Sequence, residues 1–251
     1  MNVQLEGRTA LVTGSTGGIG VGIARALVRA GATVVVSGRD DQRGAGVVAE
    51  LTAEGGQARF VRADLAEGDA AIRALADQAR DAAGGRLDVL VNNAAMLIDP
   101  EATPDVPATL ITSALHVNVT APFLLTGILA PQMAERGWGA VVNIGSINGL
   151  VGMSHSALYS ATKAALHSLT KSWAAEFAAT GVRVNTVAPG PTATSHNLGR
   201  EQLLAPLIAR IPSGRMSTID DVGAAVAFLA SDAATNIHGA TLTIDGGFAI
   251  V

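Results

Sequence analysis

The feature that most constrains the fold of this 251-residue chain is a regular alternation of short β-branched runs with longer, alanine-rich segments of helical length. Parallel strands need long crossover connections, and helices in those connections pack right-handedly against a sheet. The alternation therefore predicts an α/β fold with helices on both faces of one doubly wound parallel sheet. We expect about seven strands, at Thr9–Val12, Thr33–Val36, Ala58–Val61, Val89–Val91, Val141–Ile144, Arg183–Val187 and Thr241–Ile244.

The domain organisation is expected to be simple. No internal repeat, low-complexity tract or Gly/Ser/Pro linker divides the sequence, so we expect a single domain over residues 1–251. The least regular stretch is 189–212, which contains four prolines and lacks helical spacing before Glu201. Ligands of doubly wound sheets bind beyond the carboxyl ends of the strands, so this stretch is expected to cover a bound substrate; a plain connecting loop is the alternative.

Composition narrows the class of partner. Hydrophobic residues make up 49% of the chain, which is enough to cover both faces of a sheet, and charged residues make up only 15%. The net charge of -4 provides no basic stripe for nucleic acid. No export signal and no run of about 20 apolar residues is visible, so we expect a cytoplasmic protein that acts on small molecules and not on membranes. The absence of cysteine excludes disulfides, thiolate metal sites and a cysteine nucleophile.

A glycine-rich turn, Thr13–Gly20, lies between the first predicted strand and a helical stretch at Val21–Ala30. Glycines let the backbone approach a pyrophosphate closely, and the free N–H groups at a helix start attract its charge. The spacing Gly-x-x-x-Gly-x-Gly differs from the Gly-x-Gly-x-x-Gly fingerprint of many dinucleotide sites. The turn predicts an anion site, with a tight structural turn as the alternative.

The second predicted strand leads into Gly38, Arg39 and Asp40, where a dinucleotide fold meets the adenosine ribose. An acidic residue at the strand tip binds both ribose hydroxyls, whereas an arginine pairs with a 2′-phosphate. Arg39 therefore favours NADP(H) over NAD(H). A solvated surface arginine is the alternative, and Asp40 adds an opposing charge beside it.

Tyr159 and Lys163 are the sharpest signal in the sequence, because Tyr159 is the only tyrosine and Lys163 is one of two lysines. Residues four apart on a helix share a face. A free phenol titrates near pH ~10, and a unit charge at ~4 Å is worth about 4 kcal/mol at an effective dielectric of ~20. We therefore expect Lys163 to bring the pKa of Tyr159 toward neutrality, where it can act as a general acid and base. The alternative is a buried tyrosine beside a snorkelling lysine.

Two further polar residues accompany this pair. Ser146 ends a predicted strand thirteen residues before Tyr159, so its hydroxyl is placed to hold a substrate oxygen; a turn or cap residue is the alternative. Asn118 interrupts a mainly apolar helical stretch, where its amide needs a partner. A water site that bends the helix is one candidate.

Together these residues resemble the short-chain dehydrogenase/reductase family, and the resemblance covers nearly the whole chain. It implies a Rossmann-like fold and a nicotinamide cofactor. Two positions depart from the family pattern. Ala95 stands where glycine is usual, and Thr192 stands where a branched apolar residue is common. The added methyl group at Ala95 is expected to shift the cofactor slightly. The resemblance is carried, in order, by Gly14–Gly20, Asp64, Asn92-Asn93-Ala94, Asn118, Ser146, Tyr159, Lys163 and Pro189-Gly190.

The resemblance implies a catalytic tetrad of Asn118, Ser146, Tyr159 and Lys163. In it, Tyr159 is the acid in reduction and the base in oxidation, while Ser146 hydrogen-bonds the reacting oxygen. Lys163 holds the nicotinamide ribose and Asn118 positions water in a proton relay. The implied cofactor-binding residues are Gly14, Ser15, Thr16, Gly18, Ile19, Gly20, Arg39, Asp64, Leu65, Asn92, Ala94, Tyr159, Lys163, Pro189, Gly190, Thr192 and Thr194.

The expected activity is hydride transfer between NADP(H) and a ketone or secondary alcohol. No metal is expected, because the tyrosine supplies the proton and the cofactor the hydride. Relatives commonly form tetramers, so a homotetramer is implied by analogy. The candidate pocket residues are mostly uncharged, which favours a neutral substrate. They are Met96, Ile147, Asn148, Met153, His155, His196 and Leu203.

Two other functions stay open. One is a 3-oxoacyl-thioester reductase acting on carrier-linked chains, for which Arg200 and Arg210 would meet an acidic carrier. The other is a cofactor-binding regulator that has lost catalysis. The presence of all four tetrad residues argues against the regulator.

Overall fold

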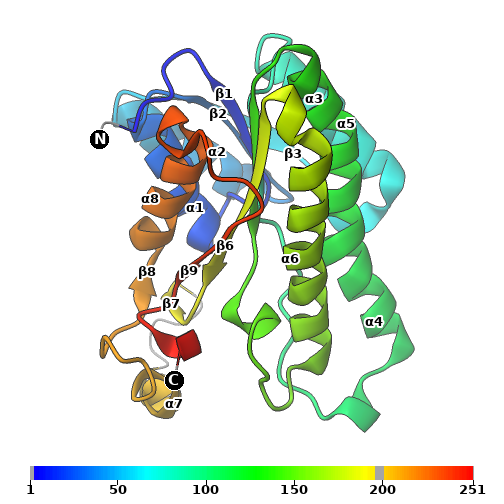
Figure 1. Cartoon of the computed structure of the whole chain (residues 1–251), viewed down its shortest axis with the longest axis vertical. Coiled ribbons are helices and arrows are strands. Elements are labelled where there is room, and N and C mark those ends of the chain that lie inside the picture. Colours follow the sequence, from blue (N-terminus) through cyan, green and yellow to red (C-terminus); the bar gives the residue numbers. More distant parts are fainter. Residues whose placement is uncertain (1–2, 196–200, 251) are drawn as a thin grey trace.

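The computed structural model in Figure 1 describes residues 3–195 and 201–250. Its main sheet is parallel throughout and has the strand order β3-β2-β1-β4-β5-β6-β9. All seven predicted strands are confirmed, and several extend by one or two residues because flanking backbone continues the ladder. The strands are β1 (Thr9–Val12), β2 (Thr33–Gly38), β3 (Gln57–Arg62), β4 (Val89–Asn92), β5 (Gly139–Ile144), β6 (Val182–Pro189) and β9 (Thr241–Ile244).

Helices connect the strands and cover both faces of the sheet, as predicted. In Figure 1, α1, α2 and α8 lie on the left face, and α3, α5 and α6 on the right. A separate pair, β7 (Thr192–Ala193) and β8 (Ser217–Thr218), is too short to leave a periodic signal in the sequence. The helices are α1 (Gly18–Arg29), α2 (Asp41–Ala53), α3 (Asp69–Ala82), α4 (Ala108–Leu115), α5 (Ala121–Glu135), α6 (Ala157–Phe177), α7 (Glu201–Ile208) and α8 (Ile219–Ala230), with a π-helical turn at His116–Thr120.

The two faces of the sheet carry separate apolar cores. Successive residues of a strand point to opposite faces. Ala10 and Val12 of β1 therefore pack in the core under α1 and α8, whereas Leu11 packs in the core under α3, α5 and α6. Because both faces are buried, strands β1, β2 and β4 are largely continuous apolar runs, whereas β6 also buries the polar side chains of Arg183, Asn185 and Thr186.

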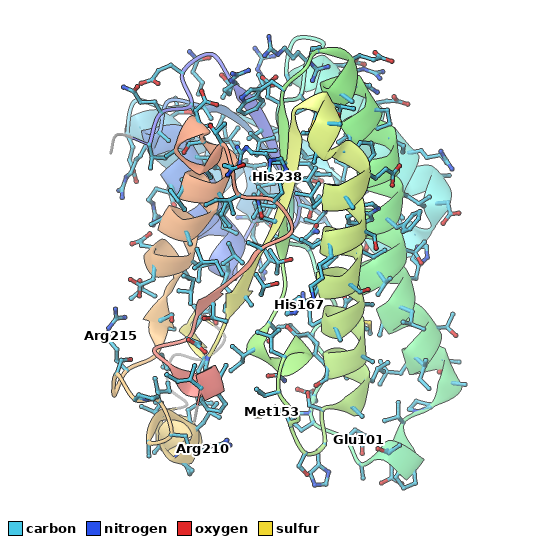
Figure 2. The ribbon with its side chains drawn as sticks, viewed as in Figure 1. Glu101, Met153, His167, Arg210, Arg215 and His238 are labelled. Carbon is cyan, nitrogen blue, oxygen red and sulfur yellow. The ribbon has the colours of Figure 1, made fainter. Side chains whose placement is uncertain are left out.

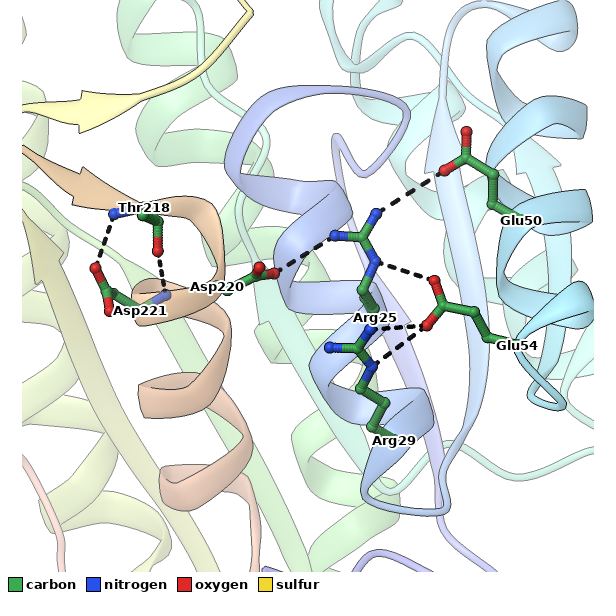
Figure 3. Close-up of polar contacts among 7 residues, drawn as sticks. All are labelled: Arg25, Arg29, Glu50, Glu54, Thr218, Asp220 and Asp221. Carbon is green, nitrogen blue, oxygen red and sulfur yellow. Dashed lines mark hydrogen bonds and ion pairs between the residues drawn. The ribbon is translucent and has the colours of Figure 1, made fainter.

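Helices α1 and α8 cross with their backbones in close contact. A Cβ atom at Gly22 would lie 2.7 Å from the carbonyl carbon of Ile219, and one at Gly223 would lie 2.8 Å from that of Gly22. Glycine at both positions therefore allows the crossing. The start of α8 is fixed by a capping box between Thr218 and Asp221, in which each side chain accepts a hydrogen bond from the other residue's backbone N–H (Figure 3).

Arg25 connects three helices on the outer side of this layer (Figure 3). Its guanidinium lies 3.4 Å from Asp220 of α8, 3.4 Å from Glu54 at the end of α2, and 4.0 Å from Glu50 of α2. Arg29 adds a second contact to Glu54 at 3.1 Å. Exposed ion pairs contribute little stability singly, so we attribute to this network mainly the mutual orientation of α1, α2 and α8.

One helical stretch, Ala108–Glu135, is long and apolar enough to cross a membrane by length and composition. In the structure it comprises α4, the π-helical turn and α5. Leu125, Leu129 and Met133 of α5 are buried in the core beside α3. Packing within a folded core accounts for the hydropathy of α5.

The sheet order reverses at β1, which pairs with β2 on one side and β4 on the other. The connections that leave β1 and β4 therefore run to opposite faces, and a crevice opens between them at the carboxyl ends of the strands. This crevice is where a ligand site is expected.

Candidate active site

A cleft of about 1010 Å³ lies at the carboxyl ends of the strands. Its walls come from the glycine turn, from the segments that follow β2, β3, β4, β5 and β6, and from the first turns of α6. It brings together most of the site residues predicted from sequence. These are Gly14, Thr16, Gly18, Ile19, Gly20, Arg39, Asp64, Leu65, Ala94, Ser146, Tyr159, Lys163, Pro189, Gly190, Thr192 and Thr194.

The side chains of Ser15 and Asn92 are buried behind this cleft instead of lining it. The Ser15 hydroxyl donates to the Val12 carbonyl at 2.7 Å and accepts from the Ser37 N–H at 3.0 Å. The Asn92 amide donates to the Asn143 side chain at 2.8 Å. Both side chains therefore brace neighbouring strands, and a cofactor contact by either residue stays a prediction.

Asn118 lies in the π-helical turn and is also buried behind the cleft. Its Oδ1 accepts from the Met96 N–H at 2.7 Å, and its Nδ2 donates to the Met96 carbonyl at 3.1 Å and to Thr162 Oγ1 at 3.2 Å. The amide thus ties the segment after β4 to α6. Its predicted role in positioning water stays a prediction.

The glycine turn is shaped to receive an anion. Helix α1 starts after Gly17, which has no side chain to cap the helix, so its first N–H groups are left for another acceptor. Gly14 has φ +63°, and a Cβ atom there would lie 2.8 Å from Ala94 Cα. Asn93, which sequence reasoning did not assign a role, donates from Nδ2 to the carbonyl oxygens of Thr13 and Gly14 at 2.8 and 3.0 Å. It holds the turn against the segment after β4, and the turn fits a pyrophosphate.

Two arginines line the cleft beyond the end of β2. Arg39 was predicted, but Arg43 was not; its position one helical turn further along was the available signal. Asp40 is the N-cap of α2, where its carboxylate accepts from the Arg43 N–H at 2.9 Å and lies 3.4 Å from the Arg43 side chain. The capping role explains why an acidic residue follows Arg39. Together the two arginines fit a phosphate near the adenosine end of a dinucleotide.

Tyr159, Lys163 and Ser146 meet on the other side of the cleft. Tyr159 and Lys163 lie one turn apart near the start of α6, and Ser146 follows β5. The Lys163 Nζ atom lies 5.6 Å from the centre of the Tyr159 ring and donates to the Ile144 carbonyl at 2.8 Å. The Ser146 hydroxyl accepts from the Asn148 N–H at 3.1 Å, so it also caps a short 3-10 turn.

The electrostatics of this group differ from the expectation. Burial raises the pKa of Tyr159 above its usual value, and the hydrogen bond with Ser146 only partly lowers it. Burial also lowers the pKa of Lys163 to about 8. The prediction that Lys163 brings the pKa of Tyr159 toward neutrality is therefore wrong for this structure, because desolvation outweighs the hydrogen bond with Ser146, and the Lys163 ammonium donates to the Ile144 carbonyl instead.

The candidate pocket residues are distributed over three environments. Met96 lines the cleft, together with Leu97, Ile98 and the unpredicted Asp99. Ile147 and Met153 belong instead to a small apolar cluster with Ile211 and Phe248, and Arg210 stacks on the Phe248 ring. Asn148 donates to Ser156, and His155 is exposed with φ +60°. His196 and Arg200 lie outside the described residues, as does the side chain of Leu203.

The sequence and structure are similar to known oxidoreductases. Residues 14–249 match the family described as enoyl-(acyl carrier protein) reductase. The chain is 39% identical over 246 residues to cis-4-hydroxycyclohexanecarboxylate dehydrogenase of Sinomonas cyclohexanicum, with 97% of each chain covered. The structure matches a short chain dehydrogenase/reductase family protein with TM-score 0.89 and 43% identity, covering 99% of this chain and 100% of that one. It matches 3-oxoacyl (acyl-carrier-protein) reductase from Agrobacterium tumefaciens C58, solved with NADP bound, with TM-score 0.91 and 36% identity, covering 98% and 95%.

A doubly wound sheet with a cleft at its switch point, combined with these relatives, defines the protein as an oxidoreductase of the dehydrogenase and reductase class. The predicted resemblance is confirmed. The chain belongs to the short-chain dehydrogenase/reductase family.

Proposed function

We propose that this protein transfers hydride between NADP(H) and a neutral ketone or secondary alcohol, with Tyr159 as the general acid and base. The observation that carries the proposal is the joint lining of one cleft by Tyr159, Ser146 and Lys163 from the α6 side and by Arg39 and Arg43 from the β2 side. A relative of the same fold binds NADP, which supports the choice of cofactor.

The cofactor would lie along the cleft. The N–H groups at the start of α1 would bind its pyrophosphate, and Arg39 with Arg43 would pair with its 2′-phosphate. Asp64 would contact the adenine, and Thr194 would contact the nicotinamide end. When bound, the nicotinamide supplies or accepts the hydride.

The protein's own part of the reaction is proton transfer at the substrate oxygen. Tyr159 would give its hydroxyl proton to a ketone oxygen in reduction and take a proton from an alcohol in oxidation. Ser146 would hydrogen-bond the same oxygen, since it already interacts with the Tyr159 hydroxyl. Lys163 would hold the nicotinamide ribose, and its charge would favour the phenolate in oxidation.

The proposed substrate class is supported by apolar residues that line the same cleft as Tyr159. Met96, Leu97 and Ile98 form an apolar part of the cleft, which supports a neutral substrate. A 3-oxoacyl thioester is the second candidate, because a 3-oxoacyl (acyl-carrier-protein) reductase is among the similar structures. For this second candidate, Arg210 was predicted to meet an acidic carrier. In the structure its guanidinium packs over the Phe248 ring, 4.7 Å from the ring centre.

The wider organisation is part of the same proposal. We propose a single domain over residues 1–251 that acts in the cytoplasm, with 189–212 covering the substrate. We also propose a homotetramer, because Ile111 and Leu115 of α4 and Phe123 of α5 are exposed apolar side chains on one long helical stretch. Light scattering should then give four times the 25.3 kDa chain mass; a monomer at micromolar concentration would contradict this part.

The function is tested by assaying a panel of neutral ketones, secondary alcohols and 3-oxoacyl thioesters with NADPH or NADP⁺ and, in parallel, NADH or NAD⁺. We expect turnover of a neutral ketone, with NADPH preferred. Faster reduction of thioesters than of simple ketones would favour the second candidate. Tight NADPH binding without turnover of any panel member would favour a regulator that has lost catalysis.

A further inference from the structure

His167 lies on the same face of α6 as Tyr159 and Lys163, eight and four positions further along the helix. Its side chain is buried between the helix and the end of the sheet (Figure 2). The Nε2 atom accepts a hydrogen bond from the Ser146 N–H at 3.4 Å. The imidazole therefore contacts the backbone of the residue whose hydroxyl interacts with Tyr159.

The loop around Ser146 is built to admit this imidazole. A Cβ atom at Gly145 would lie 2.7 Å from His167 Cδ2 and would overlap Nε2. A Cβ atom at Gly149 would lie 3.1 Å from His167 Cε1. Gly145 thus lets the ring lie directly against the turn, and Gly149 lets the turn approach both the ring and the backbone of α6, where a Cβ atom would lie 2.9 Å from Ala164 N. The ring therefore limits how far Ser146 can move.

In this arrangement one nitrogen of the His167 ring is left without a hydrogen-bond partner among the described residues. Since Nε2 is an acceptor, the ring proton is on Nδ1, and that atom is buried without a partner among the residues the structure describes. An unpaired buried donor is destabilising, so an apolar side chain of similar size would serve a purely structural core better.

The charge state of the ring agrees with the acceptor role. Burial, with help from the nearby charges of Lys163 and Lys171, lowers the pKa of His167 to about 4. The ring is therefore neutral at physiological pH. A protonated ring would turn an N–H toward the Ser146 N–H and a positive charge toward Lys163.

We propose that His167 is a positioning residue of the active site, which fixes Ser146 through its backbone N–H so that the serine hydroxyl faces Tyr159. The inference rests on the proposed function, because its kinetic consequence appears only if Tyr159 and Ser146 act together at a substrate oxygen. His167 itself does not line the cleft.

The test compares His167→Leu, which removes the acceptor, with His167→Gln, which keeps an acceptor on a side chain of similar reach. Leu166→Ala is the matched control, because it removes buried apolar volume from the adjacent position of the same helix. Substrate is the ketone and alcohol pair that the wild type turns over best. In His167→Leu we expect kcat to fall about tenfold with the Kd for NADPH within about twofold of wild type.

The pH profile separates positioning from stability. The hydrogen bond with Ser146 lowers the pKa of Tyr159. If His167→Leu displaces Ser146 and this hydrogen bond is lost, the pH at which the rate of alcohol oxidation rises, here called the limb, should move to a higher value. His167→Gln should restore most of kcat and the wild-type limb. Leu166→Ala should lower Tm without moving the limb. The inference is overturned if His167→Leu keeps the wild-type kcat and profile, or if Leu166→Ala shifts the profile equally.

Hydrogen exchange gives a readout that is independent of turnover. The Ser146 amide should exchange faster in His167→Leu than in wild type, and His167→Gln should restore its protection. Equal protection in all three proteins overturns the inference. Failure of the wild type to turn over any panel member, with the exchange difference present, overturns the proposed function and leaves the His167 contact standing.

Discussion

The Lys163 ammonium lies over the Tyr159 ring, 5.6 Å from its centre. Its hydrogen bond goes to the Ile144 carbonyl at 2.8 Å, which anchors α6 to the end of β5. Burial raises the pKa of the Tyr159 hydroxyl, and its interaction with Ser146 lowers that pKa in part. Lys163 and Ser146 thus have separable roles.

Tyr159→Phe should abolish turnover and keep cofactor binding. The substitution removes only the hydroxyl, so the ring still fills its place and the cleft keeps its shape. We expect kcat to fall by about 10²–10⁴, the usual worth of general acid and base catalysis. Steady-state assays give kcat, and NADPH fluorescence titration gives Kd. Residual activity near the wild-type rate would assign proton transfer to another group.

Arg39→Ala and Arg43→Ala should each weaken NADPH binding while leaving NADH nearly unaffected. A hydrogen bond to a charged group contributes roughly 1.5–3 kcal/mol, so each loss should raise the Kd for NADPH by about ten- to a hundredfold. The measurement is a titration of each variant with both cofactors. Arg59→Ala is the control, because it removes an exposed arginine of β3 that does not line the cleft. Equal losses for NADH and NADPH would show that neither arginine reads the 2′-phosphate.

Lys163→Met should change how stability depends on pH. The pKa of buried Lys163 is lowered from 10.5 to about 8, so between these values the unfolded chain binds more protons than the native protein. The wild-type free energy of unfolding should therefore rise with pH in this window relative to that of the variant, by about 2–3 kcal/mol between pH 8 and 10. Urea unfolding at several pH values without cofactor measures the difference. Parallel curves for the two proteins would mean that the lysine is not desolvated.

Gly22→Ala should destabilise the contact between α1 and α8. Its Cβ atom would meet backbone atoms of Ile219, which can move only if the helices separate, so we expect a loss of about 1–3 kcal/mol. Gly46→Ala is the matched control, because it lies on an exposed part of α2 with open space around its Cα atom. It should gain about 0.5–1 kcal/mol through helix propensity. Thermal unfolding measures the stability of both variants. An equal change in Tm would show that α1 and α8 can accommodate the added methyl group at Gly22.

Much of the fold could be predicted because its signals are local. Residues 34–36 and 141–142 are buried on both faces, and this leaves short runs of valine that indicate strands. The glycine turn and the four-residue spacing of Tyr159 and Lys163 are local as well. Strands β7 and β8 were not predicted, since two residues each carry no period.

Side-chain environments were harder to predict, because they depend on neighbours distant in sequence. Ser15 has a polar side chain in the glycine turn, yet its partner is Ser37 of the adjacent strand. Asp40 looked like a charge opposing Arg39, and the start of α2 makes it a helix cap. Arg43 lines the cleft because it lies in the first turn of α2, and the position of that helix depends on the tertiary structure.

The sequence by itself determined the order of the main strands and helices along the chain, the family, and most of the residues at the cleft, because hydrophobic periodicity and motif spacing depend on neighbouring positions. The tertiary structure alone decided the state of those residues. Burial raised the pKa of Tyr159 and lowered that of Lys163, and the packing of α6 against the loop after β5 brought His167 to Ser146. Desolvation and contact arise only when segments far apart in sequence exclude water together.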